Sequence, residues 1–191
     1  MSYFGASFRQ SERLRYERLT ADHATALHRV LADARVYACL GAQPPSLAAM
    51  TAEFAERARG PSPARALREH WLNVAVSCRP TPGADNSGNL VAPTYIGRLE
   101  ATIYRDPTPW AEVAYLFGVP WWGQGLAHEA MRWWLTQLSD GGVRVVWAAV
   151  APPNARSLRL LQRLGFHERP ASVAPSLGSY DAGDRVLRYD A

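Results

Sequence analysis

The stretch WAEVAYLFGVPWWGQGLAHEAMRWWLTQL, residues 110–138, decides which fold this chain adopts. Its first part, 112–119, alternates between two faces as a β-strand does, with Val113, Tyr115, Phe117 and Val119 on one and Glu112, Ala114, Leu116 and Gly118 on the other. Pro120 has no N–H to donate and ends the strand. An amphipathic helix follows the next turn, because apolar residues recur three and four apart at Ala127, Ala130, Met131, Trp134, Leu135 and Leu138.

The turn between this strand and this helix suits the binding of an anion. Gly123 and Gly125 flank Gln124, so the backbone can turn tightly and approach a ligand closely. The first amides of a helix have no internal acceptor, and the helix dipole adds partial positive charge at that end. Residues 123–127 would therefore direct several N–H groups at a phosphate or pyrophosphate. Because a G-x-G pair is also common in turns that bind nothing, the turn by itself favours neither interpretation.

The length and composition are those of a globular protein. With 191 residues, 48% of them hydrophobic, the chain can bury a substantial core, and we expect one domain over residues 1–191 with a flexible extension at 1–12. No apolar run approaches the roughly twenty residues of a membrane span, and the beginning does not resemble a secretory signal. Cys39 and Cys78 match no metal or redox spacing, so we expect reduced thiols, no metal site and a cytoplasmic location.

The charge of the chain argues against two kinds of partner. The net charge of +4 is modest and dispersed, and all 21 basic residues are arginine. No basic run carries interleaved aromatic residues, so we expect no nucleic acid as a partner, and no segment suits a membrane. An arginine-rich surface does favour anionic cofactors.

The remaining segments predict a mixture of strands and helices. Further strands are expected at 14–19, 71–78, 94–104, 143–150 and 185–189. Helices are expected at 21–33, 46–59 and 64–69, with Thr20 and Ser46 as N-caps. His23 and His28 fall on the polar side of the first helix and are expected in solvent. The strands before residue 112 are spaced for antiparallel pairing, whereas the strand, helix and strand from 112 to 150 predict a right-handed parallel crossover.

A second motif occupies residues 151–166, APPNARSLRLLQRLGF. Asn154 is placed as the N-cap of a helix, and Ser157, three residues later, can reach back to it. Gly165 stands where a left-handed residue ends a helix, after the buried stripe of Leu158, Leu161 and Leu164. On spacing alone, helix capping explains Asn154 and Ser157 better than contact with a ligand does.

The two motifs together resemble a known superfamily. PWWGQGLAHEA and NARSLRLLQRLGF resemble the paired signatures of the GNAT N-acetyltransferases, and EVAYLFG with the earlier RLRYERLTADHATAL resembles their RimJ/RimL-like branch. The resemblance covers residues 14–166. It implies an α/β (α+β) fold with a mixed, mostly antiparallel central sheet of about seven strands, flanked by helices and containing a splayed parallel strand pair. It also implies acetyl-CoA as the donor cosubstrate and a primary amine, in a small molecule or at a peptide N-terminus, as the acceptor.

The resemblance assigns the donor site to particular residues. In the family, the strand matching 112–119 parts from its parallel neighbour, here 143–150, and the pantetheine arm enters the gap. The backbone of Phe117, Gly118 and Val119 would bind the arm, and the turn would hold the pyrophosphate through Trp122, Gly123, Gln124, Gly125, Leu126 and Ala127. Asn154 would add a contact. Pro120 replaces the Gln or Arg of many relatives, which matters little because the contacts are to backbone N–H groups.

The implied reaction is direct attack of a neutral amine on the thioester in a ternary complex. It needs a base, a donor for the oxyanion and a partner for the leaving thiolate. Glu112 matches an acidic residue often assigned as the base, and partial burial would raise its pKa, although an ordinary surface glutamate is the alternative. A main-chain amide near 116–118 is expected to face the oxyanion. Leu161 occupies the place of the tyrosine of many members, and Ser157 matches the serine used by the RimL-like branch.

The resemblance leaves the acceptor and the oligomeric state open. The groove would be lined by 37–45 and 172–184, with Trp71 and Trp110 as further candidates, and the acceptor would be a protein N-terminus, a free amino acid, a polyamine or an aminoglycoside-like antibiotic. A homodimer is compatible with the family. Two other classes remain, a non-catalytic acyl-CoA-binding sensor and a nucleotide-binding α/β domain. The second lacks both glycine-rich phosphate-binding motifs of such domains.

Overall fold

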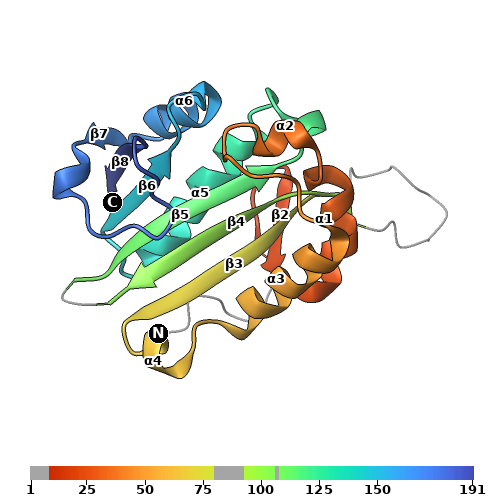
Figure 1. Cartoon of the computed structure of the whole chain (residues 1–191), viewed down its shortest axis with the longest axis horizontal. Coiled ribbons are helices and arrows are strands. Elements are labelled where there is room, and N and C mark those ends of the chain that lie inside the picture. Colours follow the sequence, from red (N-terminus) through yellow and green to blue (C-terminus); the bar gives the residue numbers. More distant parts are fainter. Residues whose placement is uncertain (1–8, 80–92, 106–107) are drawn as a thin grey trace.

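The computed structural model describes residues 9–79, 93–105 and 108–191, which fold around one mixed sheet (Figure 1). Eight strands occur in the order β1-β2-β3-β4-β5-β6-β8-β7. They are β1 (Arg9–Gln10), β2 (Leu14–Arg18), β3 (Glu69–Cys78), β4 (Tyr95–Tyr104), β5 (Trp110–Phe117), β6 (Val145–Val150), β7 (His167–Arg169) and β8 (Arg185–Asp190). All neighbours pair antiparallel except β5 and β6, which are parallel. The predicted fold class is confirmed. The short β1 and β7 bring the strand number to eight, because two and three residues are too few to show a periodic pattern.

The helices follow the predicted segments closely. They are α1 (Ala24–Leu31), preceded by the 3-10 turn η1 (Ala21–His23), α2 (Ala34–Tyr37), α3 (Leu47–Arg59), α4 (Pro63–Ala66), α5 (Leu126–Asp140) and α6 (Ala155–Arg163), with further 3-10 turns η2 (Val119–Trp121) and η3 (Ala171–Val173). The predicted cap of α3 is confirmed, since the Ser46 hydroxyl accepts the Ala49 N–H at 3.2 Å. The helix predicted at 64–69 ends earlier because Glu69 already pairs with Tyr104 of β4.

The sheet is covered on both faces, with α3 in front of it and α5 behind it in Figure 1. The larger cluster buries Met131, Trp134 and Leu138 of α5 against one face. The smaller cluster buries α1 and α3 against the other face through Leu27 and Phe54. Each large apolar side chain that leaves water contributes roughly 1.5–3 kcal/mol, so these two layers hold β5 rigidly in the middle of the sheet.

The N-terminal segment belongs to the sheet as far as the structure describes it. A flexible extension was expected for residues 1–12, but β1 pairs with β2 and the Ser11 hydroxyl donates to Glu129 of α5 at 2.6 Å. Residues 9–12 are thus held by the sheet and by α5, and no local pattern shows the contact of Ser11 with Glu129, which lies 118 positions further along the chain. Residues 1–8 lie outside the described part, as do residues 80–92 between β3 and β4.

The prediction that both histidines of the first helix face solvent is wrong for His23. Its side chain is 8% exposed, its Nδ1 accepts the Thr20 N–H at 3.0 Å, and its ring meets Tyr95 edge-on at 5.1 Å. The cause is η1, because a tighter 3-10 turn places residue 23 on a different side than a continuous α-helix would. His28 is half-buried, with its Nε2 at 3.1 Å from the Pro45 carbonyl oxygen.

Within the described residues, no helix has both the length and the apolar character needed to cross a membrane.

Candidate functional site

The strands β5 and β6 part in the middle of the sheet. Their parallel pairing covers Trp110↔Val145, Ala111↔Val146 and Glu112↔Trp147, and no further pair forms between them in the described chain. β5 stays paired with β4 as far as Phe117, and β6 stays paired with β8 as far as Val150. Each strand therefore keeps its outer neighbour while the inner edges separate. The predicted splayed pair is confirmed.

The edge of β5 that faces this gap carries main-chain groups without a strand partner. The Gly118 N–H donates to the Ile96 carbonyl of β4 at 2.9 Å. Because peptide groups alternate in direction along an antiparallel strand, those of Phe117 and Tyr115 point away from β4 and toward the gap. The Phe117 carbonyl accepts the Trp122 indole N–H at 2.8 Å. The Phe117 N–H and both Tyr115 groups are placed to pair with an extended ligand as an additional strand would.

Two of the backbone positions predicted to contact the ligand, Gly118 and Val119, already make local hydrogen bonds. Gly118 is bonded on both sides, since its carbonyl also accepts the Trp121 N–H at 3.0 Å. Val119 accepts the Trp122 N–H at 3.1 Å within η2. Neither Gly118 nor Val119 lines the cavity described below, whereas Phe117 does. The 3-10 turn η2, which the sequence pattern did not reveal, uses the Gly118 and Val119 carbonyls locally.

The turn after η2 leaves its amides free. Gly123 and Gly125 both have φ of 75°, the left-handed conformation that favours glycine. No side chain caps α5, and the first amide with a helical acceptor is that of Glu129, which donates to the Gly125 carbonyl at 3.0 Å. Within the described residues, no main-chain amide from 123 to 128 donates a hydrogen bond. The N-terminus of α5 is therefore prepared for an anion.

Arg13, which immediately precedes β2, holds this turn in place. Its Nη1 donates to the Gln124 carbonyl at 3.0 Å, and its Nε and backbone N–H both donate to Glu129 at 2.7 Å. The Gln124 side chain turns back to the Pro120 carbonyl at 2.7 Å and does not line the cavity. Although burial opposes the effect, hydrogen bonds from Ser11 and Arg13 hold the pKa of Glu129 below its usual value. Side-chain contacts therefore fix the turn, and the main-chain N–H groups of the turn stay available for a ligand.

A cavity of about 640 Å³ joins the turn to the gap. Its walls come from α2 and the residues after it, β5, the turn and α6: Arg35, Val36, Cys39, Tyr115, Leu116, Phe117, Trp121, Trp122, Gly123, Gly125, Leu126, Ala127, His128, Pro153, Asn154, Ala155, Arg156, Ser157, Arg159, Leu160 and Arg163. This volume is in the usual range for a small-molecule site. We call it the first cavity.

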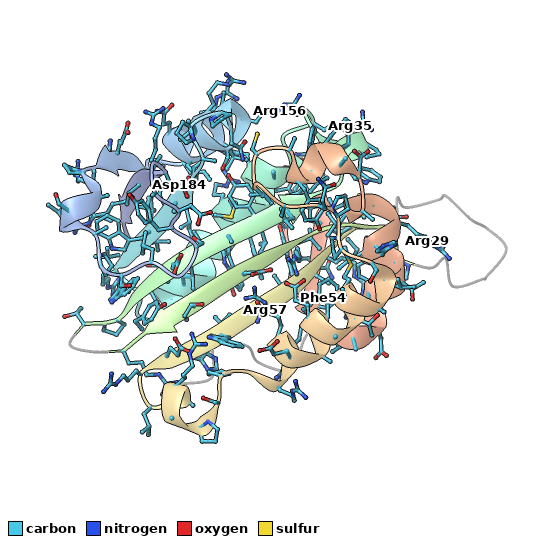
Figure 2. The ribbon with its side chains drawn as sticks, viewed as in Figure 1. Arg29, Arg35, Phe54, Arg57, Arg156 and Asp184 are labelled. Atoms are coloured by element: carbon cyan, nitrogen blue, oxygen red, sulfur yellow. The ribbon has the colours of Figure 1, made fainter. Side chains whose placement is uncertain are left out.

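Arginines make the rim of the first cavity basic. Arg35 and Arg156 lie at the same end of the molecule in Figure 2, and Arg156 stacks over the Trp122 ring at 4.4 Å. Arg159 and Arg163 extend the row along α6. These arginines were not among the predicted site residues, although their spacing of three and four residues opposite the leucine stripe of α6 is visible in the sequence.

Asn154 and Ser157 both line the first cavity, and the predicted cap is present. The Asn154 Oδ1 accepts the Ser157 N–H at 3.1 Å. The Ser157 Oγ lies 2.6 Å from the Tyr115 phenol oxygen, a contact that sequence reasoning missed. Burial raises the pKa of Tyr115 to about 12, although the Ser157 hydrogen bond acts in the opposite direction, so the phenol is protonated at neutral pH. The only sign of this contact in the sequence is that Tyr115 places a hydroxyl on an otherwise apolar face of its strand.

Glu112 faces a different cavity and is tightly held. It is 7% exposed, its Oε2 accepts the Gly178 N–H at 2.8 Å, and its Oε1 accepts both the N–H and the hydroxyl of Ser179, at 2.8 and 2.5 Å. The carboxylate thereby anchors the loop before β8 to the centre of the sheet. This is not the ordinary surface glutamate of the alternative interpretation.

This second cavity, of about 350 Å³, is lined by Glu53, Glu56, Arg57, Arg65, Trp71, Glu100, Thr102, Tyr104, Glu112, Val113, Ala114, Gly178 and Ser179. Arg57 and the nearby Arg98 pair with Glu53 and Glu100 at its base. Of the predicted groove segments, 172–184 contributes here, whereas Cys39 from 37–45 lines the first cavity. Trp71 is part of the wall, but Trp110 stacks on Tyr104 outside it at 4.0 Å.

This geometry defines a class of protein, an α/β domain in which a cavity joins the gap between two parting strands to an uncapped helix N-terminus. A sequence model described as an acetyltransferase (GNAT) domain matches residues 13–167. The chain therefore belongs to the GNAT acetyltransferase family.

Solved structures share the fold over nearly the whole chain. An acetyltransferase from Agrobacterium tumefaciens is 21% identical with a TM-score of 0.66, covering 99% of this chain and 97% of its own. A protein from Vibrio cholerae, provisionally assigned as a ribosomal-protein-serine acetyltransferase, is 16% identical with a TM-score of 0.70, covering 97% and 98%. The aminoglycoside acetyltransferase AAC(6')-Ib, solved with coenzyme A, is 13% identical with a TM-score of 0.62, covering 93% and 94%. At these identities the likeness shows the fold alone. Among curated proteins, none matches the chain significantly.

Proposed function

We propose that this protein is an N-acetyltransferase that moves an acetyl group from acetyl-CoA to a primary amine within a ternary complex. The single observation that carries the proposal is the first cavity, which connects free amides at 123–128 to the unpaired edge of β5. The free amides suit the phosphates of a nucleotide, and the edge of β5 suits an extended arm that carries amide groups.

The residues present fit acetyl-CoA as the donor. Gly123, Gly125, Leu126 and Ala127 would receive the pyrophosphate on their amides, with Trp122 as a wall and Gln124 shaping the turn. The arginine rim on α2 and α6 would neutralise further phosphate charge. The peptide groups of Tyr115 would pair with the pantetheine arm beside Phe117, and Asn154 would lie beside it.

The acceptor amine would enter through the second cavity, on the other side of β5. A carboxylate offers about four acceptor positions, and three of those of Glu112 are filled, which leaves one on Oε2. We propose that Oε2 accepts, at this remaining position, the proton that the amine nitrogen loses as the C–N bond forms and the C–S bond breaks. When bound, acetyl-CoA supplies the acetyl group already activated as a thioester. The Phe117 N–H, which faces the gap, is the proposed oxyanion donor, and Ser157 is the proposed partner of the departing sulfur.

We propose two kinds of acceptor amine for the same donor. Proteins that share this fold are named for acting on a ribosomal protein and on an aminoglycoside, so we propose either a peptide N-terminus, as in the RimJ/RimL-like branch, or a small-molecule amine. A cytoplasmic location and a homodimer complete the proposal. A sensor that binds acyl-CoA without transfer is the second candidate, favoured by the close engagement of Glu112 with its loop.

A thiol-release assay tests the proposal directly. Acetyl-CoA is offered with peptides, amino acids, polyamines and amino sugars, and at least one amine should release coenzyme A. Glu112→Gln should lower turnover about 10²-fold, the size of a general-base contribution, with unchanged affinity for acetyl-CoA. Binding of acetyl-CoA without thiol release from any amine would favour the sensor. Tighter binding of ATP or NAD than of coenzyme A would contradict both.

A further inference from the structure

We propose that Tyr115 is a positioning residue that aims the Ser157 hydroxyl at the sulfur of the departing coenzyme A. The inference rests on the proposed function and deepens it by adding a residue to the same site. It assigns Tyr115 a role through Ser157, without contact with the reacting atoms.

The two side chains meet across the first cavity from distant parts of the chain. Tyr115 comes from the part of β5 that is no longer paired with β6, and Ser157 comes from the first turn of α6. Their side-chain oxygens are 2.6 Å apart. The Tyr115 ring packs against the main hydrophobic cluster, which restricts its movement. The backbone of Ser157 is fixed as well, since its main-chain N–H donates to the Asn154 Oδ1. Leu161, at the position where many relatives carry a tyrosine, is fully buried in the core.

The hydrogen-bonding capacity of a hydroxyl sets the direction of the contact. A serine hydroxyl has one hydrogen and two acceptor lone pairs. A phenol is more acidic than an alkyl alcohol and is the better donor, so Tyr115 donates and the Ser157 Oγ accepts. The single Ser157 hydrogen is then not used toward Tyr115 and is left for the cavity, where the sulfur would leave. Without the phenol, the Ser157 hydroxyl is free to rotate.

Tyr115 does not itself supply a proton. Its pKa of about 12 lies well above the roughly 8.5 of an ordinary thiol, so proton transfer from the phenol to the thiolate is uphill. The electron pair of the broken C–S bond stays on sulfur, which leaves as a thiolate stabilised by the Ser157 hydrogen bond, and no proton passes along the pair. Tyr115 therefore acts by orientation.

A double-mutant cycle separates this role from a merely structural one. Tyr115→Phe keeps the ring and removes only the hydroxyl, and it should lower kcat about 10-fold, as expected for one hydrogen bond, with the KM for acetyl-CoA within about twofold of wild type. Ser157→Ala should lower kcat at least as much. The double variant should match Ser157→Ala alone, because the phenol acts through the serine. Tyr189→Phe, which removes a phenol outside both cavities, is the matched control and should leave kcat unchanged.

A second readout needs no acceptor and no turnover. The thiolate absorbance of bound coenzyme A, followed against pH, reports the pKa of its thiol. A donated hydrogen bond stabilises the thiolate, so Tyr115→Phe and Ser157→Ala should both raise this pKa by a similar amount, and Tyr189→Phe should not.

Two results would overturn the inference. One is an unchanged kcat in Tyr115→Phe, and the other is a double variant whose losses multiply. If wild type released no thiol with any amine, the proposed function would fail. The titration of bound coenzyme A would then decide by itself whether the Tyr115–Ser157 pair reaches the sulfur, since an unshifted thiol pKa in both variants rejects the contact.

Discussion

Glu112 is predicted to stabilise the fold as well as to serve the reaction. In Glu112→Gln, the amide oxygen still accepts from Ser179, but the amide nitrogen then faces the Gly178 N–H, donor against donor. A buried N–H left without an acceptor costs about 1–3 kcal/mol. The two remaining bonds lose the negative charge of their acceptor, which at least halves their strength. We therefore expect the free energy of unfolding to fall by about 2–4 kcal/mol.

Urea denaturation checks this magnitude. The midpoint should move with an unchanged slope, which assigns the loss to stability and not to a change in the denatured state. Ser179→Ala removes only the hydroxyl contact and should cost about 1 kcal/mol. Glu56→Gln changes an exposed carboxylate of the second cavity without an ion pair in the described chain, and it should cost close to nothing. A Glu112→Gln variant as stable as wild type would refute the reasoning.

The same variants separate the two roles of Glu112. Loss of turnover in Glu112→Gln has two causes, a missing base and a displaced loop. Ser179→Ala loosens the loop but keeps the carboxylate and the free position on Oε2. If proton acceptance matters most, Ser179→Ala should retain kcat within about threefold of wild type. A loss in Ser179→Ala as large as that in Glu112→Gln would assign the effect to the loop.

Three further outcomes follow from the site. Gly118→Ala places a Cβ 2.8 Å from the Val30 carbonyl oxygen, so the end of β5 must shift; we expect a loss of about 1–3 kcal/mol in urea denaturation and weaker binding of acetyl-CoA. Because the pKa of Glu129 is lowered in the folded protein, its carboxylate stabilises the fold above the ordinary carboxyl pKa of about 4.3, and this stabilisation is lost as pH falls through the folded-state pKa. In urea denaturation, the stability difference between wild type and Glu129→Gln should be largest near neutral pH and vanish in acid. Arg159→Ala should raise the Kd for acetyl-CoA several-fold at low ionic strength, and the difference should shrink in 1 M salt, where charges are screened within about 3 Å; an equal difference in both buffers would exclude a charge effect.

The sequence predicted the elements and the anion-binding turn because both have local causes. Alternation at 112–119 reports a strand, and the three-and-four spacing after Gly125 reports a helix, within a few residues of the observed bounds. Caps such as Ser46 and Asn154 act within three positions of themselves. The positive φ of Gly123 and Gly125 is likewise a property of the residue type.

The tertiary structure alone decided which of these residues meet. Tyr115 and Ser157 are 42 positions apart, and Glu112 and Ser179 are 67 apart, so no periodic pattern connects them. Their contacts depend on the order of strands in the sheet and on where β5 leaves β6. The η2 turn was not predicted either, and Gly118 and Val119 beside it do not line the first cavity. Periodicity describes neighbours along one element, whereas a site is formed by side chains that packing brings together from several.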